Sequence, residues 1–325
     1  MTELEGLQGA ALVQAGDRDL IEVGVGPIAP GSDVVCSPGT RFQLASVSKQ
    51  FTAAAILVLV DRGPLALDHP ITKWVDGCPS SWAEITLHHL LTHTAGLVHW
   101  PQLPELSLTA RIAPEEELAH FFDAPLLTAP GTRYAYSSPG YVLLAHVVER
   151  AATRAYAAFL ADELFGPLAM PATFAGNGDG EPDRAVGTVH GVEVDSAELD
   201  VVGMGAGDVW STVGDLARWD RALAAGAILS DAARGAMLTV HTPVDEAEAT
   251  LARPVVEVDG YGYGWYLGRL GGGPKMIFHT GGNAGFVTVN AWFPDEDLRV
   301  VILANDESVD LLAVASQLLG IAFSG

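Results

Sequence analysis

Hydrophobic and polar positions divide the chain into two ends that favour strands and a middle that favours helices. Residues 8–26 alternate loosely between apolar and polar around Gly16-Asp17, which is typical of a half-buried β-hairpin. A short strand over 41–44 is expected to follow. Strand signals return after Val256, where turn residues separate four segments, 261–268, 275–281, 285–293 and 298–305. We expect these segments to form an antiparallel meander.

The apolar segment from Val47 to Arg62 has a different pattern. It is almost wholly apolar and ends at Gly63-Pro64, which predicts a buried helix with a defined stop. A last apolar segment, 311–323, is expected to be a helix that packs on the sheet. Further short helices, joined by Pro-rich loops, are expected near 85–92, 114–123, 139–165 and 212–226.

Strands at both ends with helices between them predict an α+β fold. We expect an antiparallel sheet built from the N- and C-terminal segments, flanked by helices, with an inserted and mainly helical subdomain. The prediction is one domain over residues 1–325, in which 1–70 and 236–325 form the sheet region and 71–235 the helical subdomain. A hydrophobic content of 49% supports a sizeable core.

Composition narrows the classes of partner. Forty acidic residues against 17 basic ones give a formal net charge of −23, and the acidic residues are scattered along the chain. Nucleic-acid binding is therefore not expected, because phosphate binding needs clustered cations. The longest apolar run, Ala53 to Val60, is too short to span a bilayer, and no membrane association is expected.

The N-terminal sequence MTELEGLQGA lacks the cationic and apolar regions of a secretory signal, so a cytoplasmic location is expected. Two cysteines, Cys36 and Cys78, are present. Without an export signal, cysteines are more often free and buried thiols than a disulfide.

Candidate chemistry begins with Ser46-Val47-Ser48-Lys49 at the start of the apolar helix. The i, i+3 spacing places the serine hydroxyl and the lysine amine on one helix face. A serine hydroxyl is a weak nucleophile until a neighbouring group takes its proton. Ser-x-x-Lys is common by chance, but the chain has only three lysines beside fourteen arginines. A lysine that precedes so apolar a helix needs a functional partner or a shifted pKa.

Two later segments accompany this pair. A loop with the sequence Tyr-Ala-Tyr-Ser-Ser-Pro-Gly-Tyr, residues 134–141, enters a helix, and its serine next to proline also fits a simple helix cap. His279-Thr280-Gly281-Gly282 ends a predicted strand just before a tight turn. Each pattern alone has low specificity. The evidence for a function comes from the order and the separation of all three along the chain.

With these three elements the sequence resembles the serine β-lactamase-like superfamily, which includes class C β-lactamases, penicillin-binding proteins that are D-Ala-D-Ala carboxypeptidases, D-aminopeptidases and related esterases. Its members share a Ser-x-x-Lys at a helix start, a Tyr-x-Asn loop and a Lys/His-Thr-Gly strand. The resemblance extends over nearly the whole chain through LLTHTAGL (90–97), LFGPLAM (164–170) and AGDVWSTVGDLARW (206–219).

The resemblance implies a role for each matching residue. Ser46 would be the nucleophile, Lys49 would hold or shuttle its proton, and Tyr136 would be a second acid/base, working as a phenolate favoured by the nearby ammonium. The backbone N–H groups of Ser46 and Gly282 would form the oxyanion hole. The substrate edge would be lined by His279, Thr280 and Gly281. No cofactor or metal is implied.

Two departures from the family pattern concern substrate recognition. Ser138 stands where many members carry asparagine, and its shorter side chain offers fewer donors to a substrate amide. His279 stands in place of lysine, which removes a fixed positive charge. We therefore expect a small-molecule ester or amide as substrate and an esterase-like serine hydrolase. Acyl transfer to another acceptor, D-aminopeptidase, DD-peptidase or β-lactamase activity with the same residues, and a non-catalytic binding protein remain alternatives. Oligomeric state is open.

Other chemistries have less support in the sequence. No serine lies in a Gly-x-Ser-x-Gly elbow, which argues against an α/β-hydrolase. His88, His89 and His93 lack the glutamate of a His-Glu-x-x-His motif, so a metal site is not expected. The glycines at 203, 205 and 207 do not have dinucleotide-binding spacing and are expected to form a loop beside the active site.

Overall fold

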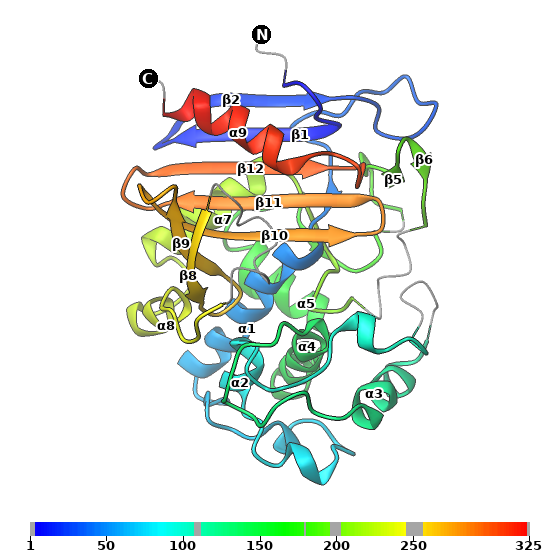
Figure 1. The fold of residues 1–325 in the computed structure, drawn as a ribbon, viewed down its shortest axis with the longest axis vertical. Coiled ribbons are helices and arrows are strands. Elements are labelled where there is room, and N and C mark those ends of the chain that lie inside the picture. The colour runs from blue at the N-terminus through cyan, green and yellow to red at the C-terminus, as the bar shows by residue number, and fades with distance from the viewer. Residues whose placement is uncertain (1–3, 107–111, 179, 196–202, 245–255, 324–325) are drawn as a thin grey trace.

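The computed structural model describes residues 4–106, 112–178, 180–195, 203–244 and 256–323. Its centre is a seven-stranded antiparallel sheet that joins both ends of the chain, in the order β2-β1-β12-β11-β10-β9-β8 (Figure 1). The strands are β1 (Gly9–Ala15), β2 (Arg18–Val25), β8 (Val256–Tyr261), β9 (Tyr266–Leu270), β10 (Lys275–Asn283), β11 (Phe286–Phe293) and β12 (Leu298–Ala304).

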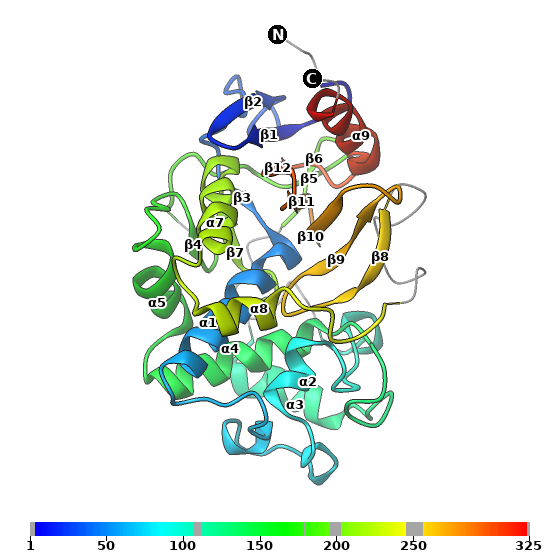
Figure 2. The ribbon, with the colours of Figure 1, turned by 90° about the vertical axis from the view of Figure 1, so that its left-hand side faces the viewer.

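β1 and β12 hold the two ends of the chain together. They pair antiparallel, with Leu12 opposite Val301, and every residue of β12 is buried. The reason is that helices cover both faces: α9 (Leu311–Ala322) lies on one side of the sheet and α7 (Val213–Ala225) on the other (Figure 2). Burial is therefore nearly continuous along these two strands rather than alternating, and it includes Gln14 and Arg299.

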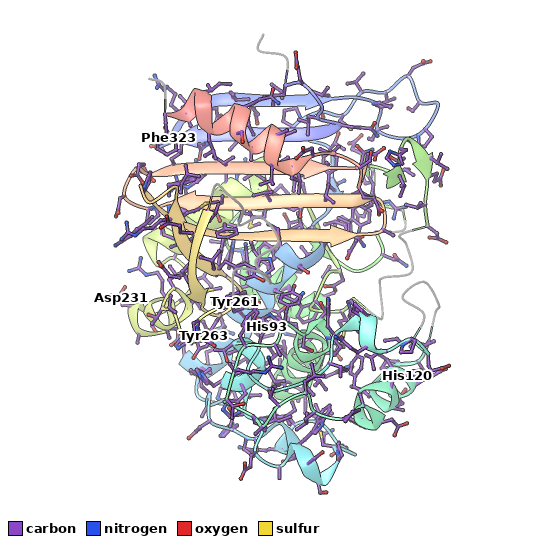
Figure 3. All side chains as sticks on the ribbon, viewed as in Figure 1. His93, His120, Asp231, Tyr261, Tyr263 and Phe323 are labelled. Atoms are coloured by element: carbon purple, nitrogen blue, oxygen red, sulfur yellow. The ribbon has the colours of Figure 1, made fainter. Side chains whose placement is uncertain are left out.

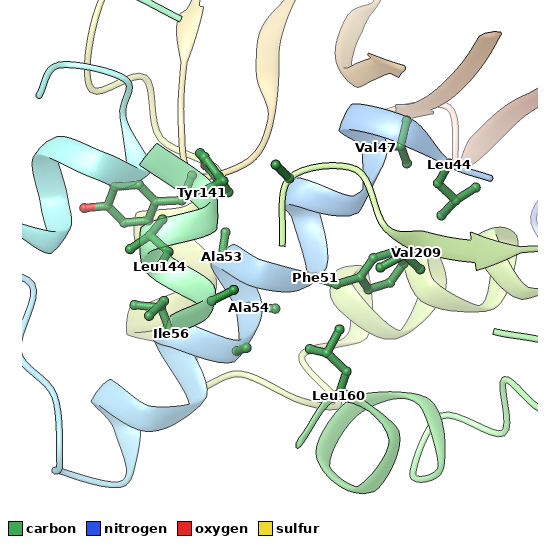
Figure 4. Packing of buried hydrophobic residues seen from close by; sticks show 14 of the residues in the cluster. Leu44, Val47, Phe51, Ala53, Ala54, Ile56, Tyr141, Leu144, Leu160 and Val209 are labelled. Atoms are coloured by element: carbon green, nitrogen blue, oxygen red, sulfur yellow. The ribbon is translucent and has the colours of Figure 1, made fainter. Parts of the chain in front are cut away.

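Helix α1 (Lys49–Asp61) runs through the middle of the molecule, and its first eleven residues are buried. Ala53 and Ala54 are small enough to let α4 (Ser138–Ala152) pack closely against it, while Phe51 contacts the opposite side near Val209 (Figure 4). The remaining helices are α2 (Leu87–Leu91), α3 (Pro114–Asp123), α5 (Tyr156–Leu160) and α8 (Asp231–Met237).

The structure confirms the α+β class, the N-terminal hairpin and the C-terminal meander followed by a helix. The helix expected over 139–165 is wrong as one element: α4 ends at Thr153, which has a positive φ of 54°, and α5 is followed by a π-helical turn at Ala161–Phe165. The strand expected over 261–268 is also wrong as one element, because the Gly262 N–H donates to the carbonyl of Trp265 and closes a turn between β8 and β9.

The middle of the chain contains strands that the sequence pattern did not reveal. β7 (Val209–Ser211) pairs with β3 (Phe42–Gln43) on one side and with β4 (Phe174–Ala175) on the other. A separate small pair is formed by β5 (Thr188–Val189) and β6 (Val192–Glu193). Helix α7, which also comes from this middle block, packs on the large sheet. The exact division into a sheet region and a helical subdomain stays a prediction.

Two further expectations concern thiols and membranes. Cys36 and Cys78 are both free, and Cys36 is buried while Cys78 is partly exposed. Within the described ranges, the helices are all too short or too polar to cross a bilayer.

Candidate active site

Ser46 lies in a tight turn that joins β3 to α1. The turn is a 3-10 helix, Ala45–Ser48, and Ala45 in it has a φ of 50°, a conformation that non-glycine residues rarely adopt. Strand β10 packs directly against this turn. A Cβ at Gly281 would lie 2.2 Å from the Leu44 carbonyl oxygen and 2.3 Å from Thr288 Oγ1, so only glycine fits there.

The Ser46 hydroxyl is hydrogen-bonded to two side chains that belong to different elements. Lys49 Nζ lies 3.0 Å from Ser46 Oγ, and the Tyr136 hydroxyl donates to the same oxygen at 2.8 Å. Lys49 comes from the first turn of α1, while Tyr136 comes from the loop before α4. The structure thus brings together the three residues that the sequence predicted as catalytic.

Lys49 is completely buried, and its amine contacts oxygen atoms only. Besides Ser46 Oγ, Nζ donates to Ser138 Oγ at 3.1 Å and to the Ala206 carbonyl at 2.9 Å. Burial lowers the pKa of Lys49 well below its usual value, and the negative charge of Asp208 opposes this only in part. The amine is therefore favoured in its neutral form, in which its two N–H groups donate to Ser138 and Ala206 and its lone pair faces the Ser46 hydroxyl, whose proton it can accept.

Tyr136 is held as a phenol rather than a phenolate. Burial raises its pKa well above the usual value, and nearby Tyr266 adds to the effect, while the bond to Ser46 opposes it. This direction is opposite to the expectation of a phenolate, because the neighbouring amine is itself favoured as neutral. The ring packs against His93, with centroids 4.4 Å apart, and Lys49 Nζ lies 5.0 Å from its centre.

The register of β10 directs the Gly282 N–H toward the site. Asn283 pairs with Phe286 across a two-residue turn, so Gly282 belongs to a pair whose N–H groups point away from β11. On that other side β9 pairs with β10 only over Lys275–Phe278. The Gly282 N–H therefore faces the cleft beside Ser46, as a donor to an oxyanion would have to.

His279 contacts the protein through both ring nitrogens. Nε2 lies 3.0 Å from the Tyr261 hydroxyl and Nδ1 lies 2.6 Å from the carbonyl of Thr280. Burial lowers the pKa of His279 to about 3. His279 is thus neutral at ordinary pH and braces the strand that carries Thr280. It does not supply the positive charge of the lysine found in other family members.

The cleft at Ser46 has two lobes. The smaller lobe has a volume of about 460 Å³ and includes Ser138 and Asn283. The larger lobe has a volume of about 910 Å³ and includes Tyr136. The two lobes meet at four residues that line both of them: Ser46, His99, Gly282 and Val287. The larger lobe is also lined by the expected substrate edge, which consists of His279, Thr280 and Gly281.

His99 is a site residue that sequence reasoning missed. Its Nδ1 accepts a hydrogen bond from the Ser138 N–H at 3.3 Å, which leaves Nε2 as the protonated nitrogen. Burial lowers the pKa of His99 to about 4, so the ring is neutral. His99 follows the segment 90–97 that resembles the family, and this proximity was the one available signal.

Asn283 is a second residue that was missed. Its side-chain amide donates to Gln43 Oε1 at 2.9 Å and to the Gly207 carbonyl at 3.0 Å. It therefore ties the β10–β11 turn to the loop of glycines at 203–207. That loop lines the smaller lobe through Gly203 and Gly207, as the sequence analysis expected of a loop beside the site.

The three histidines weighed as metal ligands have separate protein partners. His88 Nδ1 lies 2.8 Å from the Tyr263 hydroxyl, and His89 Nδ1 accepts from the backbone of its own helix start. His93 Nδ1 accepts from Ser137 N, and its ring lies 4.8 Å from that of Tyr261 between the sheet and the helices (Figure 3). In the part of the chain that the structure describes, no group of three such ligands could hold a metal.

A buried Ser-Lys-Tyr constellation at the junction of two lobes, on a sheet flanked by helices, defines the architecture of a serine hydrolase site. The family model described as Beta-lactamase matches residues 2–319, and the chain belongs to this family. The expected resemblance is thereby confirmed.

Individual relatives are consistent with this family. The chain is 29% identical to penicillin-binding protein 4* of Bacillus subtilis over 82% of the chain, which spans 61% of that protein's length. It is 26% identical to the D-alanyl-D-alanine-carboxypeptidase/endopeptidase AmpH of Escherichia coli, over 92% of the chain and 79% of AmpH. Esterase EstB of Burkholderia gladioli is 38% identical over 46% of the chain and 42% of the esterase.

Solved structures share the whole fold. A penicillin-binding protein from Bacillus halodurans superposes with a TM-score of 0.85 at 26% identity, covering 97% of this chain and 96% of that one. The D-amino acid amidase from Ochrobactrum anthropi SV3 gives a TM-score of 0.82 at 22% identity, covering 98% and 94%, which supports the fold alone.

Proposed function

We propose that this chain is a serine hydrolase that acts through an acyl-enzyme on an ester or a small amide. The observation that carries the proposal is the pair of hydrogen bonds at the Ser46 hydroxyl, one with the Lys49 amine at 3.0 Å and one from the Tyr136 hydroxyl at 2.8 Å. Burial favours a neutral amine and a neutral phenol, so the site holds one proton acceptor and one proton donor around one nucleophile.

In the acylation step, Ser46 Oγ forms a bond to the substrate carbonyl carbon while its proton passes to Lys49. The N–H groups of Ser46 and Gly282 receive the negative charge on the carbonyl oxygen. When the bond to the leaving group breaks, the Tyr136 hydroxyl gives its proton to the departing oxygen or nitrogen. The products are the acyl-enzyme, an ammonium at Lys49 and a phenolate at Tyr136.

Deacylation restores both groups. Tyr136 takes a proton from water as the water oxygen attacks the acyl carbon, and Ser46 Oγ recovers its proton from Lys49 when the acyl bond breaks. Each proton released in the first step is thus returned in the second. An alcohol or amine in place of water would make the same cycle an acyl transfer.

An ester or small amide is favoured by the surroundings of Ser138. Its hydroxyl accepts from Lys49 and is also hydrogen-bonded to Tyr136, and its N–H donates to His99, so both groups are already engaged within the site. His279 is neutral and offers no fixed charge to a substrate carboxylate. The similarity to an esterase over nearly half the chain agrees with this preference.

The proposal is tested by labelling with a fluorophosphonate, which reacts with activated serines. The intact mass of the protein should rise by one label, and the Ser46→Ala variant should take up none and lose hydrolysis of p-nitrophenyl butyrate. Ser316→Ala, which removes an exposed serine on α9, is the matched control and should behave like the unmodified protein. Undiminished ester hydrolysis by Ser46→Ala would overturn the assignment.

A further inference from the structure

The two lobes can be assigned to the two halves of the substrate, and this assignment rests on the proposed function. The scissile bond must lie at the junction, where Ser46 and Gly282 line both lobes. Tyr136 lines only the larger lobe, and the residue that protonates the leaving group must lie beside it. The larger lobe therefore receives the leaving group, and the smaller lobe receives the acyl group.

The smaller lobe is lined by a negatively charged side chain. Among the described residues that line it, the one side chain that carries a full charge is Glu307, which lines the lobe together with Asn283 and Ala284 of the β10–β11 turn. His99 and Trp100 line it elsewhere. His99 is neutral because burial lowers its pKa to about 4, so the lining offers Glu307 no cationic partner.

Glu307 is exposed to solvent, and hydrogen bonds hold it in place. Its Oε2 accepts from the Gly285 N–H at 3.0 Å, and its backbone N–H donates to the Thr188 carbonyl at 3.0 Å. Gly285 has a φ of 78°, and a Cβ there would lie 2.5 Å from the carbonyl carbon of Gly187, so the turn is tightly fixed. One carboxylate oxygen is thus anchored at the turn, and the charge stays at the lobe.

The loop that carries Glu307 is fixed from the other side as well. Asp306 accepts hydrogen bonds from Thr188 Oγ1 at 2.9 Å, from the Gly191 N–H at 2.7 Å and from Ser308. These bonds lower the pKa of Asp306 to about 2, so it remains ionised. A second negative charge beside Glu307 adds to the field of the lobe.

The larger lobe differs in this respect. Its lining includes Arg133 as well as Asp310, and Asp310 Oδ1 already accepts from the N–H groups of Leu312 and Ala313 at the start of α9. A positive charge in the substrate would therefore meet both a negative side chain, Asp310, and a positive one, Arg133, and their effects on it would oppose each other. In the smaller lobe, the charge that the described lining presents is the negative charge of Glu307.

We propose that the smaller lobe binds an acyl group that carries a protonated amine, with Glu307 as the residue that binds the ammonium. The substrate class is then the amides or esters of amino acids with a free amino group. The carboxylate supplies an acceptor and a counter-charge for an ammonium group at the lobe. An N-acylated or uncharged acyl group would leave this interaction unmade.

A competition assay tests the inference without requiring turnover. The rate of fluorophosphonate labelling at Ser46 is measured with increasing alaninamide, of either hand, or isobutyramide, in which a methyl group replaces the ammonium. We expect alaninamide to protect Ser46 at a concentration about tenfold lower than isobutyramide, the size of one charge-assisted contact. Glu307→Gln should reduce this preference to about twofold or less, and Glu307→Lys should abolish it.

Glu296→Gln is the matched control, because Glu296 is an exposed carboxylate in the β11–β12 turn and its removal changes net charge equally. The control should keep the full preference. Equal protection by the two amides, or an unchanged preference in Glu307→Gln, would overturn the inference while labelling at Ser46 left the proposed function standing. Absence of labelling in the unmodified protein would instead contradict the proposed function.

Discussion

Lys49 and Gln50 are consecutive residues at the start of α1, and both are completely buried. Their polar groups differ in how fully they are hydrogen-bonded. The Lys49 amine has hydrogen-bond partners in Ser46, Ser138 and Ala206. Gln50 accepts from Asn290 at 3.2 Å, but its own Nε2 has no partner among the described residues. One residue along the helix separates a satisfied polar group from an unsatisfied one.

The cluster around Gln50 extends across the interior face of the sheet. Asn290 of β11 also donates to Asp220 of α7 at 2.9 Å, and Asp220 Oδ2 and Asn290 Oδ1 have no partner within the described ranges. Burial raises the pKa of Asp220 to about 7, and the bond from Asn290 opposes this. We refer to Gln50, Asn290 and Asp220 as the interior polar cluster.

The comparison shows what separates reactive polar groups from structural ones in this molecule. Both sets are buried and both shift pKa values, so neither burial nor a shifted pKa identifies the site. The difference is that the Lys49 set includes Ser46, which opens into both lobes of the cleft, whereas no member of the interior polar cluster lines either lobe. Substitutions should therefore affect activity in the first set and stability in the second.

The largest effect is expected from Lys49→Met, which keeps the length of the side chain and removes the proton acceptor. Acylation of Ser46 should slow by ~1000-fold, within the usual range for loss of a general base. The measurement is the rate of fluorophosphonate labelling, with circular dichroism to verify folding. Gln50→Met, the matched change one residue along, should keep labelling within about threefold; an equal loss in both variants would remove the distinction between the two sets.

Tyr136→Phe should reduce turnover by ~100-fold or more, because the phenol donates to Ser46 and would protonate the leaving group. The loss in kcat/KM, which reports acylation, should shrink for esters with acidic leaving groups, because these need no proton, whereas the loss in deacylation should be the same for every leaving group. Steady-state kinetics on p-nitrophenyl and ethyl esters separates these cases. A uniform loss in kcat/KM across leaving groups would contradict the role of Tyr136 as proton donor.

Much of this site could be predicted because its chemistry lies in short local patterns. The i, i+3 spacing of Ser46 and Lys49 is set by helix geometry alone. The short apolar run Met276–Phe278, bounded by turn residues, is enough to reveal β10. The apolar helix after Lys49 marked the lysine as buried, which the structure confirms.

The remainder depends on long-range contacts that a local pattern does not contain. His99 reaches the cleft because its ring accepts from Ser138, 39 residues away, and Glu307 reaches it through Gly285. The short strand β7 forms because β3 and β4 flank it, not because three residues have strong strand propensity. The protonation of Tyr136 also depended on the burial of its neighbours, which changed the expected phenolate into a phenol.

Asp220→Asn should alter stability and its dependence on pH while leaving activity unchanged. The folded-state pKa of Asp220 is raised to about 7 from 3.8, so its contribution to stability is greatest below pH 4 and is lost as pH rises through 7. Between pH 5 and pH 8 this group alone should cost ~2–3 kcal/mol of unfolding free energy. Urea unfolding at both pH values should show a smaller difference in the variant; an identical difference would mean that Asp220 does not titrate in this range.

The smallest effect is expected from Ser138→Asn, at the boundary between the reactive set and substrate recognition. The Ser138 hydroxyl is engaged by Lys49, so it has little to offer a substrate amide. An asparagine amide could accept from Lys49 through its oxygen and donate to the substrate through its nitrogen. One added hydrogen bond of ~1 kcal/mol should raise labelling by a fluorescent penicillin about fivefold. Ser138→Ala removes the hydroxyl without adding a donor and should not raise labelling. If the two variants are labelled by penicillin to the same extent, the missing amide is not what limits acylation by β-lactams. The limiting factor is then the absence of a positive charge at His279 in the larger lobe.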